Sequence, residues 1–210
     1  YHKDNQWVLK GINLSIKKGE RIGVIGSTGG GKSTLIDLIL CLLNPTKGKI
    51  VADGKNISND IEEWQNIIGY VPQDVYFTDD TIAANVAFGI DKEDIDKNLI
   101  LSALESVKLT ETISQMPLGI ETIIGESGFK LSGGQRQRIS IARALYASPE
   151  IIILDEATSA LDFNTENSIV EVMTKLKGHK TIILVSHRQN TIINCDKVYE
   201  FKNGALKENN

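Results

Sequence analysis

Hydrophobic and polar residues follow two different periods along the chain, and these periods predict which segments form strands and which form helices. Apolar residues alternate with polar ones over residues 12–16, which is typical of a half-buried strand. Residues 21–25 predict a second strand, which runs into a group of glycines. From Ser33 to Leu43 the period is helical, with four apolar residues on one face, and Pro45 is expected to end this helix.

Further along, short apolar strands alternate with longer helical stretches. Residues 50–52 predict a short strand closed by an Asp-Gly turn, and residues 75–148 are expected to be mostly helical. The segments 151–154 and 181–185 are continuous apolar runs, as in strands buried on both faces of a parallel sheet. A helix with an apolar stripe over residues 169–176 lies between them. Strands that alternate with helices predict an α/β fold.

Composition narrows the possible classes of protein. A length of 210 residues is enough for one domain with a real core, and no apolar run approaches the roughly 18 residues of a membrane span. With 23 basic and 27 acidic residues the net charge is −4, so no nucleic-acid partner is expected. Cys41 and Cys195 lie far apart without metal-site spacing, which argues for a reducing compartment; Cys41, inside the apolar helical run, is expected to be core.

The glycines after the strand at 21–25 belong to the pattern GxxxxGK[ST]. Glycines allow successive backbone N–H groups to surround an anion, and the helix that follows presents its positive dipole end. Lys32 would contact the outer phosphates, and the Ser33 hydroxyl would bind Mg²⁺, which prefers oxygen ligands. The pattern predicts a nucleoside-triphosphate site but does not choose among kinase, GTPase and ATPase. The residues expected to line it are Gly26, Ser27, Thr28, Gly29, Gly30, Gly31, Lys32, Ser33 and Thr34.

Two acidic residues, Asp155 and Glu156, end the apolar strand at 151–154. The carboxyl ends of parallel strands meet at the edge where ligands bind. Asp155 is therefore expected to bind Mg²⁺, directly or through water, and Glu156 to orient or deprotonate an attacking water. An isolated Asp-Glu pair is usually a solvated turn, but the buried strand and the phosphate loop favour function here.

The segment Leu131-Ser132-Gly133-Gly134-Gln135, which lies between these two motifs, matches a family signature. With it, essentially the whole chain resembles the nucleotide-binding domain of ATP-binding-cassette (ABC) transporters, with every expected motif in order. The resemblance implies an α/β P-loop NTPase core with a mostly parallel central sheet, an N-terminal antiparallel β subdomain and a helical signature subdomain at roughly 75–148. It also implies ATP and Mg as ligands, and one domain over 1–210, expected to follow a transmembrane domain in a longer chain.

The resemblance assigns the signature residues a role on a second subunit. Ser132, Gly133, Gly134 and Gln135 would reach the γ-phosphate of ATP held by the partner, which implies a head-to-tail dimer. The complete motif set favours a homodimer, although a heterodimer stays open. Taken alone, the segment is also compatible with an ordinary helix start capped by Ser132.

Three further positions acquire roles from the same resemblance. Gln73 matches the Q-loop, where its amide would ligate Mg or hold the attacking water; as an isolated residue it would be a surface Gln after a proline turn. His187, one residue after the segment 181–186, matches the switch histidine that contacts the γ-phosphate and Glu156. Asp162 ends a segment that matches the D-loop, which crosses the dimer interface, and it could also cap the helix that follows.

Other matches are weaker. Tyr1 lies where the family stacks an aromatic ring on adenine, and Trp7 is the alternative. The segment 126–128 resembles an exporter element that touches the transmembrane partner, but Ser127 replaces its arginine. Three arginines follow the signature on its helix and are expected to form mainly structural ion pairs: Arg136, Arg138 and Arg143.

The expected function is ATP hydrolysis that powers substrate export or lipid flipping by an attached transmembrane domain, at the cytoplasmic face of the inner membrane. Residues 64–89 faintly resemble flippases of lipid-linked sugars. The alternative is a soluble ABC ATPase, but this chain has one cassette and no coiled-coil interruption. A module that binds nucleotide without hydrolysing it would lack Glu156 or His187, and both are present.

Overall fold

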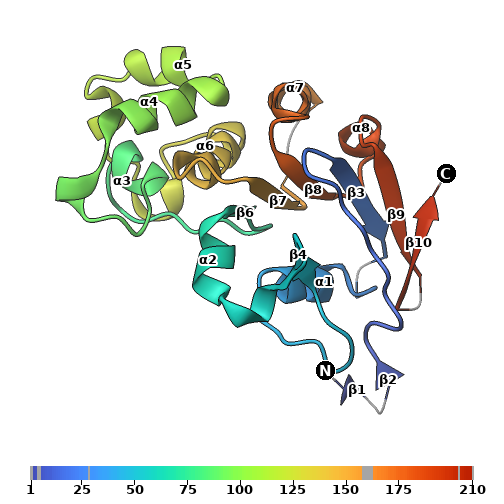
Figure 1. Ribbon diagram of the computed structural model, residues 1–210. Coiled ribbons are helices and arrows are strands. Elements are labelled where there is room, and N and C mark those ends of the chain that lie inside the picture. Colours follow the sequence, from blue (N-terminus) through green and yellow to red (C-terminus); the bar gives the residue numbers. More distant parts are fainter. Residues whose placement is uncertain (1, 4–5, 28, 158–162, 203, 210) are drawn as a thin grey trace.

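A six-stranded sheet forms the centre of the computed structural model, which describes residues 2–3, 6–27, 29–157, 163–202 and 204–209 (Figure 1). The strand order is β10-β9-β3-β8-β7-β6. Among these strands β10 alone runs antiparallel to its neighbour, so the predicted, mostly parallel sheet is confirmed. The strands are β3 (Arg21–Gly26), β6 (Ile68–Val71), β7 (Ile151–Asp155), β8 (Thr181–Val185), β9 (Lys197–Lys202) and β10 (Ala205–Asn209).

Helices cover both faces of this sheet (Figure 1). Successive side chains of a strand point to opposite faces, so the continuous apolar runs of β7 and β8 supply two cores. Ile153 and Ile183 belong to the core that includes α1 (Lys32–Ile39), whereas Ile152 and Leu184 belong to the core that includes α6 (Gly133–Tyr146) and α7 (Phe163–Leu176). The side chains of β7 and β8 are therefore buried on both faces of the sheet.

Two short antiparallel hairpins lie on the N-terminal side of the chain: β1 (His2–Lys3) pairs with β2 (Gln6–Trp7), and β4 (Val51–Ala52) pairs with β5 (Lys55–Asn56). At the predicted Asp-Gly turn between β4 and β5, Asp53 and Gly54 have φ values of 48° and 82°. Two positive φ values in succession are typical of the tight turn that joins such strands. Together with the pairing of β9 and β10, these hairpins are the antiparallel strand pairs among the described residues.

The predicted helical region between residues 75 and 148 is confirmed, and it forms a lobe beside the β6 edge of the sheet (Figure 1). The predicted stripe of α4 is fully or almost fully buried at Ile100, Ala103 and Leu104. Besides α6, the lobe contains α3 (Ile82–Val86), α4 (Lys97–Ser106), α5 (Thr110–Ser114) and the 3₁₀ turns Lys92–Asp94, Gly119–Glu121 and Glu126–Gly128.

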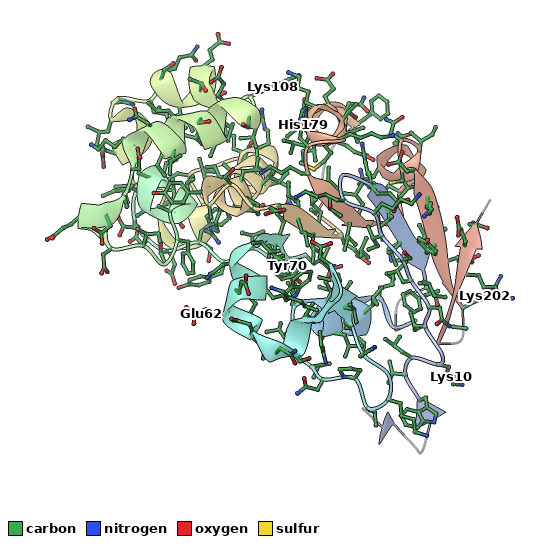
Figure 2. All side chains as sticks on the ribbon, viewed as in Figure 1. Lys10, Glu62, Tyr70, Lys108, His179 and Lys202 are labelled. Atoms are coloured by element: carbon green, nitrogen blue, oxygen red, sulfur yellow. The ribbon has the colours of Figure 1, made fainter. Side chains whose placement is uncertain are left out.

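The lobe also contacts the helix layer of the sheet through Lys108, which Figure 2 shows between the lobe and α7. The Lys108 ammonium pairs with the carboxylate of Glu171 on α7. Its backbone carbonyl accepts a hydrogen bond of 3.2 Å from Arg138 of α6. The remaining helical elements are the 3₁₀ turn Ile57–Asn59, α2 (Ile61–Asn66) and α8 (Gln189–Ile192).

The strand predicted at residues 12–16 is wrong. The segment has no regular secondary structure, although Ile12, Leu14 and Ile16 pack against the core on the α1 side of the sheet. Alternation of apolar and polar residues indicates that an extended chain buries the side chains of one face. The pattern does not indicate whether a neighbouring strand lies close enough to form backbone hydrogen bonds. None of the described strands pairs with residues 12–16.

The helix predicted from Ser33 to Leu43 ends earlier, at Ile39. Cys41 adopts a left-handed conformation with a φ of 56°, which ends the helix before Pro45 is reached. Side chains from α2 bind the last carbonyls, since Trp64 Nε1 donates to Ile39 O at 2.6 Å. Cys41 is therefore a half-buried residue beyond the helix rather than a core residue.

None of the helices in the described part of the chain is long and apolar enough to cross a membrane.

Candidate functional site

The carboxyl ends of four neighbouring parallel strands bring the predicted site residues to one edge of the sheet. The phosphate loop follows β3, and Ser186 and His187 follow β8. Asp155 and Glu156 lie at the end of β7, and Gln73 comes two residues after β6. Since β3, β8, β7 and β6 are successive neighbours in the sheet, residues from four distant parts of the sequence share this edge.

The loop between β3 and α1 depends on two glycines. Gly26 and Gly31 have φ values of 146° and 111°, which favour glycine. A Cβ atom on Gly26 would lie 2.8 Å from the carbonyl oxygen of Phe201, so the loop also needs the space that glycine leaves. Gly30 N donates to Ser27 O at 3.0 Å and closes a turn within the loop. Thr28 lies outside the described residues.

The start of α1 offers backbone donors to an anion. The helix begins at Lys32, and no side chain caps it at Gly31. The first N–H groups of a helix have no partner within the helix, so those of Lys32, Ser33 and Thr34 remain for a ligand. The positive end of the helix dipole adds to this preference for a negative group. The loop and the helix start together can therefore hold phosphate oxygens.

Lys32 carries a positive charge into this loop. Its side chain is only 6% exposed, and its ammonium donates to the carbonyls of Gly26 at 2.8 Å and Ser27 at 3.1 Å. The same nitrogen lies 3.8 Å from Oε1 of Glu156. A buried ammonium keeps its charge only when it has such partners, and the partners fix its position against the loop.

Glu156 and His187 meet beside this ammonium. Glu156 Oε1 lies 2.8 Å from His187 Nε2, and Nε2 lies 3.2 Å from Lys32 Nζ. In a neutral imidazole one nitrogen either donates or accepts, so Nε2 binds the Glu156 carboxylate in one tautomer and the Lys32 ammonium in the other. Glu156 has a φ of 49°, and its N–H donates to Val185 O at 2.9 Å. Its backbone is thus anchored to β8, the strand that leads to His187.

Asp155 lies behind Glu156 and is almost fully buried. Burial raises the pKa of its carboxyl above the ordinary value, and the Glu156 carboxylate raises it further, whereas the Lys32 ammonium opposes the shift. A carboxylate in this position is stabilised by a nearby cation. The neighbouring oxygen donors expected for a metal are the hydroxyl of Ser33 and the amide of Gln73, both on exposed residues.

This donor set fits Mg²⁺ bound together with a nucleotide. The described residues contain no cluster of three or more His, Cys, Asp or Glu side chains that could hold a metal on their own. Mg²⁺ is usually held by one or two carboxylates or hydroxyls, with phosphate oxygens and water completing its octahedron. One buried carboxylate beside a phosphate loop meets that requirement, whereas a protein-only cage would need more ligands.

The signature segment forms the start of α6. Ser132 is the N-cap: its Oγ accepts from Gln135 N at 3.2 Å, and Gln135 Oε1 accepts from Ser132 N at 2.8 Å. The capping interpretation is therefore confirmed for Ser132, and both Ser132 and Gly133 are exposed. Helix α6 packs against β6, which is three strand positions, or about 14 Å, from β3. The signature thus lies apart from the phosphate loop of its own chain.

Arg143, further along α6, is structural, but the described residues give it no ion pair, contrary to the prediction. Its Nε donates to Asn85 O at 2.8 Å and its Nη1 to Tyr76 O at 2.9 Å. The guanidinium also lies 5.1 Å and 4.7 Å from the ring centres of Phe77 and Phe88. Burial lowers the pKa of Arg143 to about 10. The arginine joins the signature helix to the segment that follows Gln73.

The other two arginines of α6 bind the backbone as well. Arg136 Nη1 donates to Leu131 O at 3.0 Å, and Arg138 Nε donates to Gly134 O at 3.3 Å. Both bonds hold the start of α6 in place around the signature.

The buried polar residues that are not among the predicted site residues include Asn85 and Glu166. Asn85 is fully buried on α3, where its Nδ2 donates to Thr78 O at 3.1 Å. Glu166 is 3% exposed on α7 and binds Arg188, the residue after His187. The signal for Glu166 was its spacing: it lies three residues before Ile169, on the apolar stripe of the helix.

Several predicted positions lie outside the described residues: Tyr1, Thr28, and the segment 158–162 with Asp162. Trp7, the alternative to Tyr1, is 40% exposed, and Lys47 Nζ lies 5.7 Å from the centre of its ring.

Comparisons with known proteins give a consistent result. The family model described as "ABC transporter" matches residues 9–159. The chain is 41% identical over 210 residues to the ATP-dependent lipid A-core flippase of Ralstonia nicotianae, covering 99% of this chain and 36% of the relative. It is also 41% identical over 209 residues to the putative multidrug export ATP-binding/permease protein YgaD of Bacillus subtilis, with coverage of 99% and 36%.

A solved structure of a bacterial Atm1-family ABC exporter with ATP bound matches with a TM-score of 0.90 at 34% sequence identity. The match covers 99% of this chain and 36% of that chain. The chain thus spans little more than a third of the length of these relatives.

Proposed function

Because the chain belongs to the ABC transporter family, we propose that residues 1–210 form one ATPase domain that powers a transmembrane domain of a longer protein. Within it, residues of roughly 75–148 act as the helical subdomain. The work done is export of a substrate or flipping of a lipid, at the cytoplasmic face of the inner membrane. Relatives named as a flippase and an exporter support this role over that of a soluble ABC ATPase.

One observation carries the proposal at the level of chemistry: Lys32, Glu156 and His187, from three different strand ends, lie within 4 Å of one another beside a phosphate loop. Such a cluster combines a cation for phosphate, a base for water and a hydrogen-bonding ring. In our proposal Tyr1 stacks on the adenine, and the loop lined by residues 26–34 holds the phosphates.

In the hydrolytic step, the oxygen of a water attacks the γ-phosphorus, and its proton passes to the carboxylate of Glu156. The bond between the γ-phosphorus and the oxygen of ADP breaks, and ADP leaves as an anion. Lys32 and the N-terminus of α1 stabilise the charge that develops on the phosphate oxygens. His187 holds the γ-phosphate, and Gln73 holds the water in line with it.

Ser33, Asp155 and Gln73 are the residues that would hold Mg²⁺ together with phosphate oxygens. When bound there, Mg²⁺ supplies positive charge that offsets the charge of the phosphates.

The signature acts on a second copy in this proposal. Ser132, Gly133, Gly134 and Gln135 contact the γ-phosphate of ATP bound to the partner, and Asp162 crosses the interface. The separation of the signature from the chain's own phosphate loop supports this arrangement. Hydrolysis removes the γ-phosphate that joins the two copies, so the homodimer closes with ATP and opens after hydrolysis.

The first test is the mass of the Glu156→Gln variant in solution, with and without ATP and Mg²⁺. We expect ATP binding to be retained, turnover to fall about 10²- to 10⁴-fold, and the monomer to become a dimer only with ATP. Glu150→Gln is the matched control, because Glu150 precedes the other end of the same strand, where it pairs with Lys18.

Each result bears on a separate part of the proposal. Turnover like that of the unaltered chain would remove Glu156 from the role of base. A chain that binds ATP but stays monomeric would oppose the shared site. Failure of the folded, unaltered chain to bind ATP would overturn the phosphate site itself.

A further inference from the structure

Glu166 is a buried acid that the proposed mechanism does not use. It lies in the first turn of α7, and its side chain is only 4% exposed. A carboxylate this deeply buried keeps its charge only where charged or polar partners replace water. The identity of those partners therefore indicates what the residue holds in place.

Both partners of Glu166 follow His187 in the sequence: Arg188 is the next residue, and Thr191 lies on α8. Arg188 Nη1 donates to Glu166 Oε2 at 2.6 Å, and Thr191 Oγ1 donates to Glu166 Oε1 at 2.9 Å. The two oxygens of one carboxylate thus bind two residues on the C-terminal side of His187, and these residues lie three positions apart in the sequence. Short charge-assisted bonds of this kind fix geometry strongly.

The segment that carries His187 is also bound by residues of β3. Ser186 N donates to Val24 O at 3.2 Å, and Ser186 Oγ accepts from Arg188 N at 3.0 Å. The fully buried Arg21, at the start of β3, donates from Nη2 to Thr191 O at 3.1 Å. His187 therefore lies between a residue tied to β3 and a residue tied to α7.

The His187 ring itself has much less support, because its side chain is 44% exposed and is in contact with Glu156 and Lys32 at the reacting edge. Its position depends on the backbone that carries it. A displacement of about 1 Å at a reacting group can lower a rate by roughly 10²-fold. Loss of the bonds from Glu166 would thus displace His187 relative to the γ-phosphate, although Glu166 itself does not contact the phosphate.

We propose that Glu166 is a positioning residue for His187, which it holds in its hydrolytic position by binding Arg188 and Thr191. The inference rests on the proposed hydrolysis of ATP at this site. It adds to that proposal a residue on α7 whose charge controls turnover rather than nucleotide binding.

The test compares Glu166→Gln with unaltered protein in the full-length protein, measuring kcat and KM for ATP. Gln has the same shape and can still accept from Thr191, but it lacks the charge that Arg188 faces. We expect kcat to fall about 10- to 100-fold while KM changes less than about twofold. Glu20→Gln is the matched control, because the Glu20 side chain is 10% exposed and pairs with Lys197 at 2.8 Å. Glu20 precedes β3, at the end of the strand that is opposite to the phosphate loop.

A double-mutant cycle separates positioning from general destabilisation. If Glu166 acts through His187, then Glu166→Gln should cost almost nothing further in a His187→Ala background. Arg188→Lys, which keeps the charge, should retain more activity than Arg188→Met; these variants alter a half-buried residue and do not depend on a buried Gln being tolerated.

The inference is overturned if Glu166→Gln has the kcat of the Glu20→Gln control, or if its effect adds in full to that of His187→Ala. It is also overturned if the loss of kcat equals the loss of folded protein measured by circular dichroism. If the unaltered protein does not hydrolyse ATP at all, the proposed function fails, and this inference fails with it.

Discussion

Replacing Asn85 by alanine should loosen α3 from the segment that follows Gln73. Asn85 is fully buried, and its side chain binds that segment through three well-formed hydrogen bonds. Its Oδ1 accepts from Thr78 N at 3.0 Å, and its Nδ2 donates to Thr78 O at 3.1 Å and to Thr81 O at 3.0 Å. Alanine removes these three bonds, together with two longer ones that Oδ1 accepts from Thr78 Oγ1 at 3.3 Å and from Arg143 Nη2 at 3.4 Å, and leaves the backbone partners without this side chain.

The size of the effect follows from these contacts. Each hydrogen bond contributes about 1 kcal/mol net, so three bonds give about 3 kcal/mol of lost stability. Thr78 and Thr81 are only half-buried, so water can bind some of the backbone groups that lose their partner. The loss of stability should therefore not greatly exceed about 3 kcal/mol. For a chain of this length, 3 kcal/mol corresponds to a fall in Tm of roughly 6–12 °C.

Urea unfolding followed by circular dichroism measures the change directly, as a lower midpoint at an unchanged slope. The matched control is Asn98→Ala, because Asn98 is an exposed asparagine in the first turn of α4 and should change stability by less than about 0.5 kcal/mol. A loss below about 1 kcal/mol, or one equal to that of the control, would refute the argument that Asn85 holds this junction.

Three further predictions follow from contacts around the sheet. Gly26→Ala should weaken ATP binding measured by titration calorimetry, because its Cβ would lie 2.8 Å from the Phe201 carbonyl oxygen; an unchanged affinity would contradict the role of this turn. The hydrogen bond from Lys177 lowers the pKa of Asp196 below its ordinary 3.8, so its contribution to stability is present above that value and is lost as the pH falls through the folded-state pKa. Urea midpoints between pH 5 and 3 should therefore fall less steeply in Asp196→Asn than in the unaltered chain. Trp64→Phe should cost about 1 kcal/mol in the same assay, because the ring remains but the bond to the last carbonyl of α1 is lost.

The parts of the site that lie within one segment were predictable from the sequence. The phosphate loop combines a strand, a glycine pattern and a helix start, and all three signals are local. Asp155 and Glu156 were predicted to lie at the carboxyl edge of the sheet because an apolar run ends there, and the structure places both at the end of β7. The family, the ATPase class and the mostly parallel sheet are confirmed because they depend on these local motifs and their order.

The parts that failed depend on partners distant in sequence. Helix α1 stops at Ile39, where the side chain of Trp64, 25 residues away, binds its last turn. Arg143 binds the backbone carbonyl of Asn85, 58 residues away. Every residue has a backbone carbonyl, so the residue types of the sequence do not indicate this partner. The grip of Glu166 on Arg188 spans 22 residues, so only the burial of a charge on an apolar stripe could have indicated it.

The chain carries two helix starts suited to phosphate, and their positions bear on how the site works. One begins at Lys32 after β3; the other begins at Gly133, on the helix that packs against β6. The first start follows Gly31 and has no side-chain cap, whereas at the second Ser132 Oγ accepts from Gln135 N and leaves the N–H groups of Gly133 and Gly134. The two starts are held by strands that lie about 14 Å apart. In the proposed site, a single nucleotide on the first therefore does not reach the second in the same chain. Two copies related by a two-fold axis would present each signature to the other's loop, and the same symmetry yields two identical sites.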